Sequence, residues 1–119
     1  MYGLLGIFIG GGAGSVLRHL LASRIGSHWG IMTVNILGAL CIGILFEWLG
    51  SKTNLRQEWR AFLMTGLLGG FTTFSTYMLD FGLLVNNHRS TEAVLYLLGS
   101  LVAGVSGLFA GMALGRLAV

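Results

Sequence analysis

Four long apolar windows dominate this chain of 119 residues and leave little room for any other structure. A helix needs about 20 mostly apolar residues to cross the hydrocarbon core of a membrane, and each window meets that length. Only short polar stretches connect the windows, so there is no place for a soluble catalytic domain. The sequence predicts an all-α integral membrane protein, a single domain over residues 1–119 with four transmembrane helices at about 3–22, 29–49, 59–85 and 93–117.

The composition supports a membrane environment and excludes several function classes. Hydrophobic residues make up 55% of the chain, charged residues 9%, and the mean hydropathy is +0.83, which is too apolar for a soluble domain of this size. The net charge of +3 comes from scattered residues without a basic cluster, so we expect no nucleic-acid partner. No nucleophile–base set or His/Cys/Asp cluster with metal-ligand spacing is visible, so we expect no enzyme activity.

The third window carries the feature that most suggests a function. Between Gly66 and Tyr77 it contains five hydroxyl side chains and three glycines. Irregular polar backbone at membrane depth is tolerated only where it packs inside protein or lines a pathway. Because the chain has 20 glycines and no proline, any helix break must come from glycine and hydroxyl side chains. We therefore expect the third helix to be broken near the membrane midplane.

Small residues recur at every fourth position in the first and last windows. Such spacing lets helix backbones approach each other closely, which is how helices associate in lipid. We interpret both series as packing faces. They are Gly6, Gly10 and Gly14 in the first window and Gly99, Ala103, Gly107, Gly111 and Gly115 in the last.

The basic residues at the span ends are almost evenly divided between the two sides of the membrane. Orientation normally follows an excess of Lys and Arg in cytoplasmic loops, so this chain should insert in both orientations and form an antiparallel homodimer. The alternative is that lipid or insertion machinery selects one orientation. Lys52, Arg56, Arg60 and Arg116 are expected on the side of the termini, and Arg18, Arg24 and Arg89 on the other.

Few polar side chains lie inside the apolar windows, and each needs a partner. Asn35 is about six residues into the second window, where an unpaired amide is costly; it either joins two helices or donates to a passing anion. Tyr96 and Ser100 are four residues apart and share one helix face, although a lone helix serine often bonds its own backbone. Arg18 and Asp80 could simply reach towards the membrane surface.

Three segments resemble the Fluc (CrcB) family of fluoride channels, and the resemblance extends over the whole chain. They are GGGAGSVLR at residues 10–18, VNILG at 34–38 and GGFTTFST at 69–76. The resemblance implies a fluoride-selective channel in the bacterial plasma or inner membrane that lets cytoplasmic fluoride leak out passively. It also implies an antiparallel dimer with two pores and a structural sodium ion at its centre.

The resemblance also implies roles for individual residues. Phe74 corresponds to a phenylalanine that lines the fluoride path, and Asn35 to an asparagine whose amide contacts the ion. Tyr96 and Ser100 correspond to a hydroxyl track, and Arg18 to an arginine near the aqueous mouth. Main-chain carbonyls of Gly69 and Thr72 from both subunits would hold the sodium ion, and Asp80 stands where a glutamate is usual.

This sequence departs from the family pattern at three positions. Tyr77 replaces a second pore phenylalanine and so offers either a hydroxyl donor or a ring edge to the fluoride path. Ile31 replaces a common threonine, and Gly104 replaces a serine that would extend the hydroxyl track. We expect the last two roles to be missing here.

Two other functions fit the size and the number of spans. A small dual-topology multidrug exporter would need an acidic residue deep in the first span, and none is present there. A membrane scaffold subunit without transport would explain the glycine faces. It would leave Asn35 and the hydroxyl-rich stretch 72–76 without a purpose.

Overall fold

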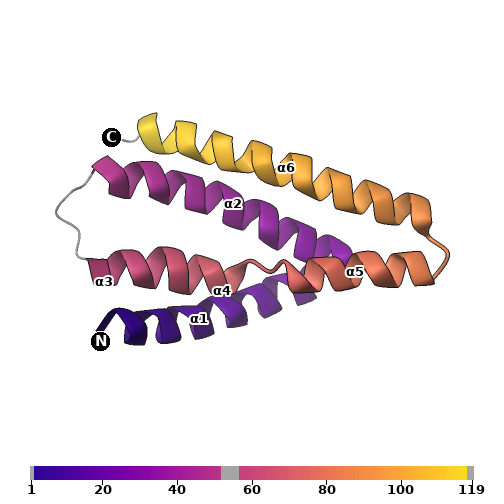
Figure 1. Ribbon diagram of the computed structural model, residues 1–119, viewed down its shortest axis with the longest axis horizontal. Helices are drawn as coiled ribbons and strands as arrows, with labels where there is room; N and C mark the ends of the chain where they lie inside the picture. The colour runs from indigo at the N-terminus through magenta and orange to yellow at the C-terminus, as the bar shows by residue number, and fades with distance from the viewer. Residues whose placement is uncertain (1, 52–56, 118–119) are drawn as a thin grey trace.

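The computed structural model describes residues 2–51 and 57–117, and no β-strand occurs among them. Three long helices are α1 (Tyr2–Ile25), α2 (Ser27–Ser51) and α6 (Ser90–Leu117). Figure 1 shows the helices running back and forth along the long axis of the molecule, so that α1 begins and α6 ends at the same end. That axis measures 52 Å, more than the roughly 30 Å of a membrane's hydrocarbon core.

Within the described residues, three helices are long and apolar enough to cross a membrane, at Gly3–Ile25, Ser27–Gly50 and Ser90–Leu117. The windows predicted at 3–22, 29–49 and 93–117 lie within them. The surface is apolar as well, with Phe8 80% exposed and Val102 68% exposed. Large apolar side chains that point away from the protein are expected where lipid or another subunit replaces water. The chain is therefore a multi-pass membrane protein.

The third window forms helical segments on both sides of a break. The first side consists of α3 (Gln57–Arg60), a π-helix η1 (Ala61–Leu68) and α4 (Gly69–Phe71), and the second is α5 (Ser75–Asn86). Figure 1 shows the irregular link between α4 and α5 near the middle of the molecule. The widened turns of a π-helix are frequent at functional sites. The break predicted within this window is thus present in the structure.

The connections differ from the expected loops. Residues 23–28 were expected to form a loop, but α1 and α2 are separated only by Gly26, whose φ of +81° is readily available only to glycine. Asn87, His88 and Arg89 connect α5 to α6. Lys52 and Arg56, which were included in the charge balance, lie outside the described residues.

Two glycine-lined contacts hold the helices together. On one side α1 packs against η1 and α4: a Cβ added at Gly10 would lie 2.7 Å from the Phe62 carbonyl oxygen. On the other side α2 packs against α6: a Cβ added at Gly115 would lie 2.7 Å from the Ile44 carbonyl oxygen. The predicted packing faces are used in both contacts, except that Gly99 approaches only the flexible end of Met32, at 3.9 Å.

Candidate functional site

The helix break covers Thr72, Thr73 and Phe74. Thr72 has extended backbone angles, φ −90° and ψ 156°, which end α4. Helical angles return at Phe74, and α5 begins at Ser75. An interrupted helix leaves backbone N–H and C=O groups without their usual partners four residues away. Side chains from neighbouring helices take up several of these groups.

Asn35 makes a two-point contact with the backbone of the break. Its Oδ1 accepts from the Thr73 N–H at 2.8 Å, and its Nδ2 donates to the Thr73 carbonyl oxygen at 2.9 Å. The amide thus joins α2 to the break. This agrees with the first interpretation of Asn35 from the sequence, that its side chain joins two helices. A carboxamide has two N–H donors, of which one is used here, and Asn35 also lines the groove described below.

Side chains of α1 bond a second backbone group next to the break. Arg18 Nη1 donates to the Gly70 carbonyl oxygen at 3.1 Å, and Ser15 Oγ lies 3.5 Å from the same oxygen. Arg18 was expected near an aqueous mouth. In the structure it reaches from α1 to the end of α4 and is not among the residues that line the groove, and its position relative to an aqueous mouth stays a prediction. Its guanidinium is partly buried, where a carbonyl oxygen replaces water as its partner.

Thr73 also organises the start of α5 with its own hydroxyl. Its Oγ1 accepts from the Thr76 N–H at 3.3 Å and donates to the Thr76 Oγ1 at 3.3 Å. This bond spans three residues, the spacing by which threonine caps the first turn of a helix. The sequence analysis did not single out Thr73 or Ser15. The Thr73-x-x-Thr76 spacing at the start of a helix was the signal that could have identified Thr73.

A groove of about 360 Å³ lies beside the break, between α2, α5 and α6. It brings together most of the residues selected from the sequence, and Gly104 leaves open space at its α6 side. Arg18 and Tyr96 do not line it. Its lining residues are Asn35, Gly38, Ala39, Ile42, Leu68, Gly69, Thr72, Thr73, Phe74, Tyr77, Ser100, Leu101, Gly104 and Val105.

Two aromatic rings lie at the edge of this groove. Phe74 is 70% exposed, and its ring meets the Tyr77 ring edge to face with centroids 6.1 Å apart. The edge of an aromatic ring carries positive partial charge and can face an anion. Tyr77 is buried, and its hydroxyl donates to the Leu97 carbonyl oxygen on α6. The Tyr77 hydroxyl is thus used within the protein, while the residue lines the groove.

Tyr96 and Ser100 share a face of α6 but have different surroundings. Tyr96 is fully buried, and its hydroxyl donates to Asp80 Oδ2 at 3.1 Å, so this donor points away from the groove. Ser100 lines the groove and is 8% exposed. Its Oγ makes no hydrogen bond of ordinary geometry, although it lies close enough to Tyr77 to interact with that hydroxyl. Of this pair only Ser100 lines the groove, and its Oγ atom is itself buried.

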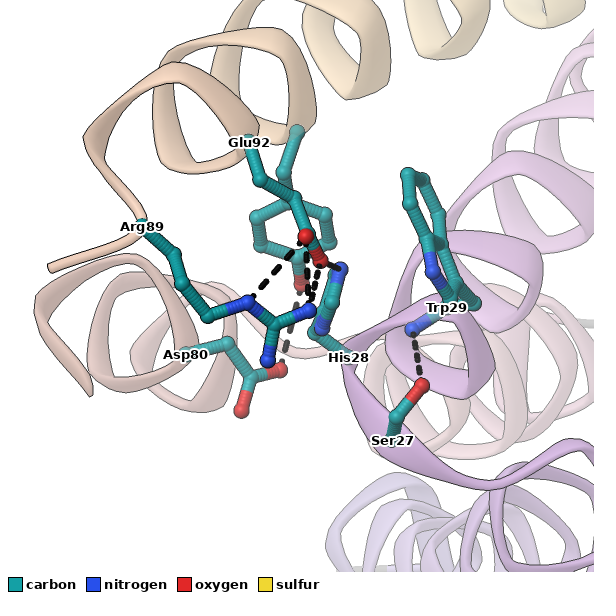
Figure 2. A network of polar contacts seen from close by, with 7 residues as sticks. Ser27, His28, Trp29, Asp80, Arg89 and Glu92 are labelled. Atoms are coloured by element: carbon teal, nitrogen blue, oxygen red, sulfur yellow. Dashed lines mark hydrogen bonds and ion pairs between the residues drawn. The ribbon is translucent and has the colours of Figure 1, made fainter. Parts of the chain in front are cut away.

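A network of polar side chains lies next to Tyr96. Figure 2 shows Glu92 between Arg89 and His28: its carboxylate lies 2.6 Å from Arg89 Nη2 and 2.9 Å from His28 Nε2. The buried His28 ring packs against the Tyr96 ring at 4.8 Å. These contacts join the beginning of α2 to the beginning of α6. Tyr96, which packs on His28 and bonds Asp80, is thus connected to this network.

The carbonyl oxygens of Gly69 and Thr72 both lie at the break and have lost their usual helical donors. In a continuous helix the Thr73 N–H would donate to Gly69, and the Thr76 N–H to Thr72. Here these N–H groups are bonded to Asn35 Oδ1 and Thr73 Oγ1. Carbonyl oxygens suit a hard cation, whereas no cluster of His, Cys, Asp or Glu that could hold a metal occurs in the described ranges.

The arrangement was compared with known proteins. Residues 5–112 match the model of the family described as CrcB-like protein, Camphor Resistance (CrcB). The chain is 44% identical to the "Fluoride-specific ion channel FluC" of Methylobacterium nodulans, with 98% of each chain covered. It is 41% identical to the "Fluoride-specific ion channel FluC 2" of Nitrobacter hamburgensis, covering 92% of this chain and 94% of that one. With a full-length match of this kind, and with the three segments at 10–18, 34–38 and 69–76 packed around one helix break, this chain belongs to the CrcB family.

Proposed function

We propose that this protein is a fluoride-selective ion channel of the bacterial plasma membrane, which lets cytoplasmic fluoride leave the cell passively. The observation that carries the proposal is the groove beside the helix break. Its lining includes Asn35, Ser100 and Phe74 within a chain that is mostly apolar. The curated relatives named as fluoride-specific channels support the same conclusion.

The chemistry of the groove suits a small, strongly hydrated anion. An ion that enters a narrow pore loses water, and groups of the protein must replace that water. Asn35 and Ser100 supply hydrogen-bond donors, and Phe74 supplies an electropositive ring edge. The Tyr77 ring packs against the Phe74 ring, and the Tyr96 ring packs against the Tyr77 ring with centroids 5.3 Å apart. No covalent step is involved, so the protein is not an enzyme.

A structural sodium ion fits the carbonyls at the break. Gly69 and Thr72 would hold it through main-chain oxygens, together with the same oxygens of a second subunit. When bound, the ion supplies fixed positive charge near the anion path. Arg18 adds a positive side chain at Gly70, close to these two residues. Such charges raise the local anion concentration without forming a deep trap.

The active form would be an antiparallel homodimer with two pores, and the interrupted segment would be its fourth span. The groove is open on one side, with Phe74 largely exposed. A second copy would cover this opening and complete a pore in each subunit. Arg60 and Arg116 lie towards the end of the molecule that carries both termini, and Arg24 and Arg89 towards the other, which keeps the charge near balance.

Purified protein in liposomes loaded with potassium fluoride tests this function. With valinomycin present to carry the balancing potassium current, the channel should release fluoride to an external fluoride electrode. Liposomes loaded with potassium chloride should retain chloride under the same conditions. A scaffold subunit would release neither ion. A multidrug exporter would release fluoride no faster than empty liposomes, but would move a cationic dye when a proton gradient is applied.

A further inference from the structure

At the break side chains bond two backbone oxygens, while the oxygens of Gly69, Phe71 and Thr72 accept no hydrogen bond from the described residues. The Gly70 oxygen accepts from Arg18, and the Thr73 oxygen accepts from Asn35. The oxygens of Gly69 and Thr72 have no such side-chain partner in the described part of the chain.

We infer that Asn35 and Thr73 are positioning residues for the cation, each of which keeps one carbonyl oxygen free to bind it. This inference rests on the proposed sodium site and deepens it. Asn35 Oδ1 takes the Thr73 N–H that a continuous helix would direct to the Gly69 oxygen. Thr73 Oγ1 takes the Thr76 N–H that would otherwise bond the Thr72 oxygen.

Asn35 then links the two functional parts of the molecule. Its oxygen bonds the backbone of the break, and the residue also lines the groove. Asn35 would therefore do more than line the pore. Through its bond to the backbone of the break, it would also affect the affinity for the cation. Residues that orient the direct ligands of a metal typically change its affinity by roughly 10- to 100-fold when they are replaced.

The test is sodium-dependent stability of the purified dimer in detergent. The midpoint of thermal unfolding is measured while sodium chloride replaces N-methylglucamine chloride at constant ionic strength. A ligand that binds only the folded protein raises this midpoint as its concentration increases. The wild type should show the rise, and the sodium concentration that gives half of it measures the apparent affinity.

Thr73→Val removes the hydroxyl with almost no change in volume. The Thr76 N–H should return to the Thr72 oxygen, so that the half-maximal sodium concentration rises by roughly 10- to 100-fold. Thr73→Ser keeps the hydroxyl and should respond as the wild type does. Thr33→Val is the matched control, because the Thr33 hydroxyl bonds only the Trp29 carbonyl of its own helix.

Asn35 is tested by a second pair. Asn35→Leu loses the acceptor and should weaken sodium binding to the same extent, whereas Asn35→Asp keeps an oxygen for the Thr73 N–H and should retain it. Wild-type sodium dependence in both Thr73→Val and Asn35→Leu would overturn the inference while leaving the sodium site intact. If the wild type itself shows no sodium response, both the site and the inference fail, and the separate fluoride efflux assay still decides the channel function. If Asn35→Leu does not fold, the Thr73 pair decides.

Discussion

The two glycine-packed helix pairs of this protein are similar in contact but different in backbone. In both pairs a Cβ added at the contact would overlap a backbone carbonyl, at Gly14 against Leu67 and at Gly111 against Leu40. The pair α2–α6 consists of two continuous helices. In the other pair, α1 packs against a segment that changes from a π-helix to an α-helix and then breaks.

Polar side chains join α2 and α6 near their ends, at Glu47–Arg116 and His28–Glu92, whereas at the break they bond the backbone itself. Arg18 and Ser15 reach across from α1 to the Gly70 oxygen, and Asn35 reaches from α2 to Thr73. Close packing at glycine residues therefore holds the helices together in both pairs. At the interrupted pair, side chains of α1 and α2 bond the backbone next to the break.

The largest expected effect comes from valine at the two glycine contacts. Gly14→Val and Gly111→Val would each place side-chain atoms inside a backbone carbonyl of the neighbouring helix, and neither backbone can move away without separating the pair. We expect both variants to lose the monodisperse dimer in gel filtration. Gly3→Val, which meets nothing within 4 Å, is the control. A normal dimer from only one of the two variants would show that the contacts are not equivalent.

Added lysines should abolish function by forcing one orientation. Ser23→Lys with Ile25→Lys adds charge at one end of the molecule, and Gln57→Lys with Glu58→Lys adds it at the other; all four positions are exposed. Each double variant alone should lose fluoride resistance in a strain without its own exporter, and the two together should restore it. Full resistance from either one alone, with its orientation confirmed by end-tag accessibility, would exclude the antiparallel dimer.

A smaller effect is expected from Phe74→Ile at the edge of the groove. The change removes an electropositive ring edge while the side chain stays large and apolar. Aromatic edge contacts are worth about 0.5–1.5 kcal/mol, and 1.4 kcal/mol corresponds to tenfold in rate, so efflux should slow by roughly tenfold with the dimer intact. Unchanged fluoride efflux would mean that Phe74 serves only in packing.

Tyr77→Phe should have the smallest effect on fluoride flux. The Tyr77 hydroxyl is bonded to the Leu97 oxygen and is not free to bind an ion. The variant should lose about 0.5–1.5 kcal/mol of stability, the usual net value of one hydrogen bond, and should conduct at nearly the wild-type rate. A large loss of efflux at unchanged thermal stability would assign the hydroxyl to the ion path.

Much of this architecture could be predicted from local features of the sequence. The apolar windows indicated the long helices, because length and composition alone decide whether a segment can cross a membrane. The cluster of glycine and hydroxyl residues at 66–77 indicated the break. The absence of proline strengthened that prediction, since no other helix-breaking residue was available.

The partners of the polar side chains could not be predicted, because they depend on how each helix is rotated about its axis. Arg18 bonds Gly70, Tyr96 bonds Asp80 and Tyr77 bonds Leu97, and each contact joins segments well apart in the chain. The same limit explains Gly99, which repeats the four-residue spacing of its helix but lies away from the close contact with α2.

Fluoride efflux from liposomes containing Asn35→Asp tests the central claim, that the ion path passes the helix break at this amide. The carboxylate keeps an acceptor for the Thr73 N–H but loses both amide N–H donors, including the one to the Thr73 carbonyl oxygen, and adds negative charge beside the groove. Gel filtration should show the same dimer as the wild type, while the fluoride electrode should record the slow leak of empty liposomes. Efflux at the wild-type rate from this dimer would contradict the account and remove Asn35 from the ion path.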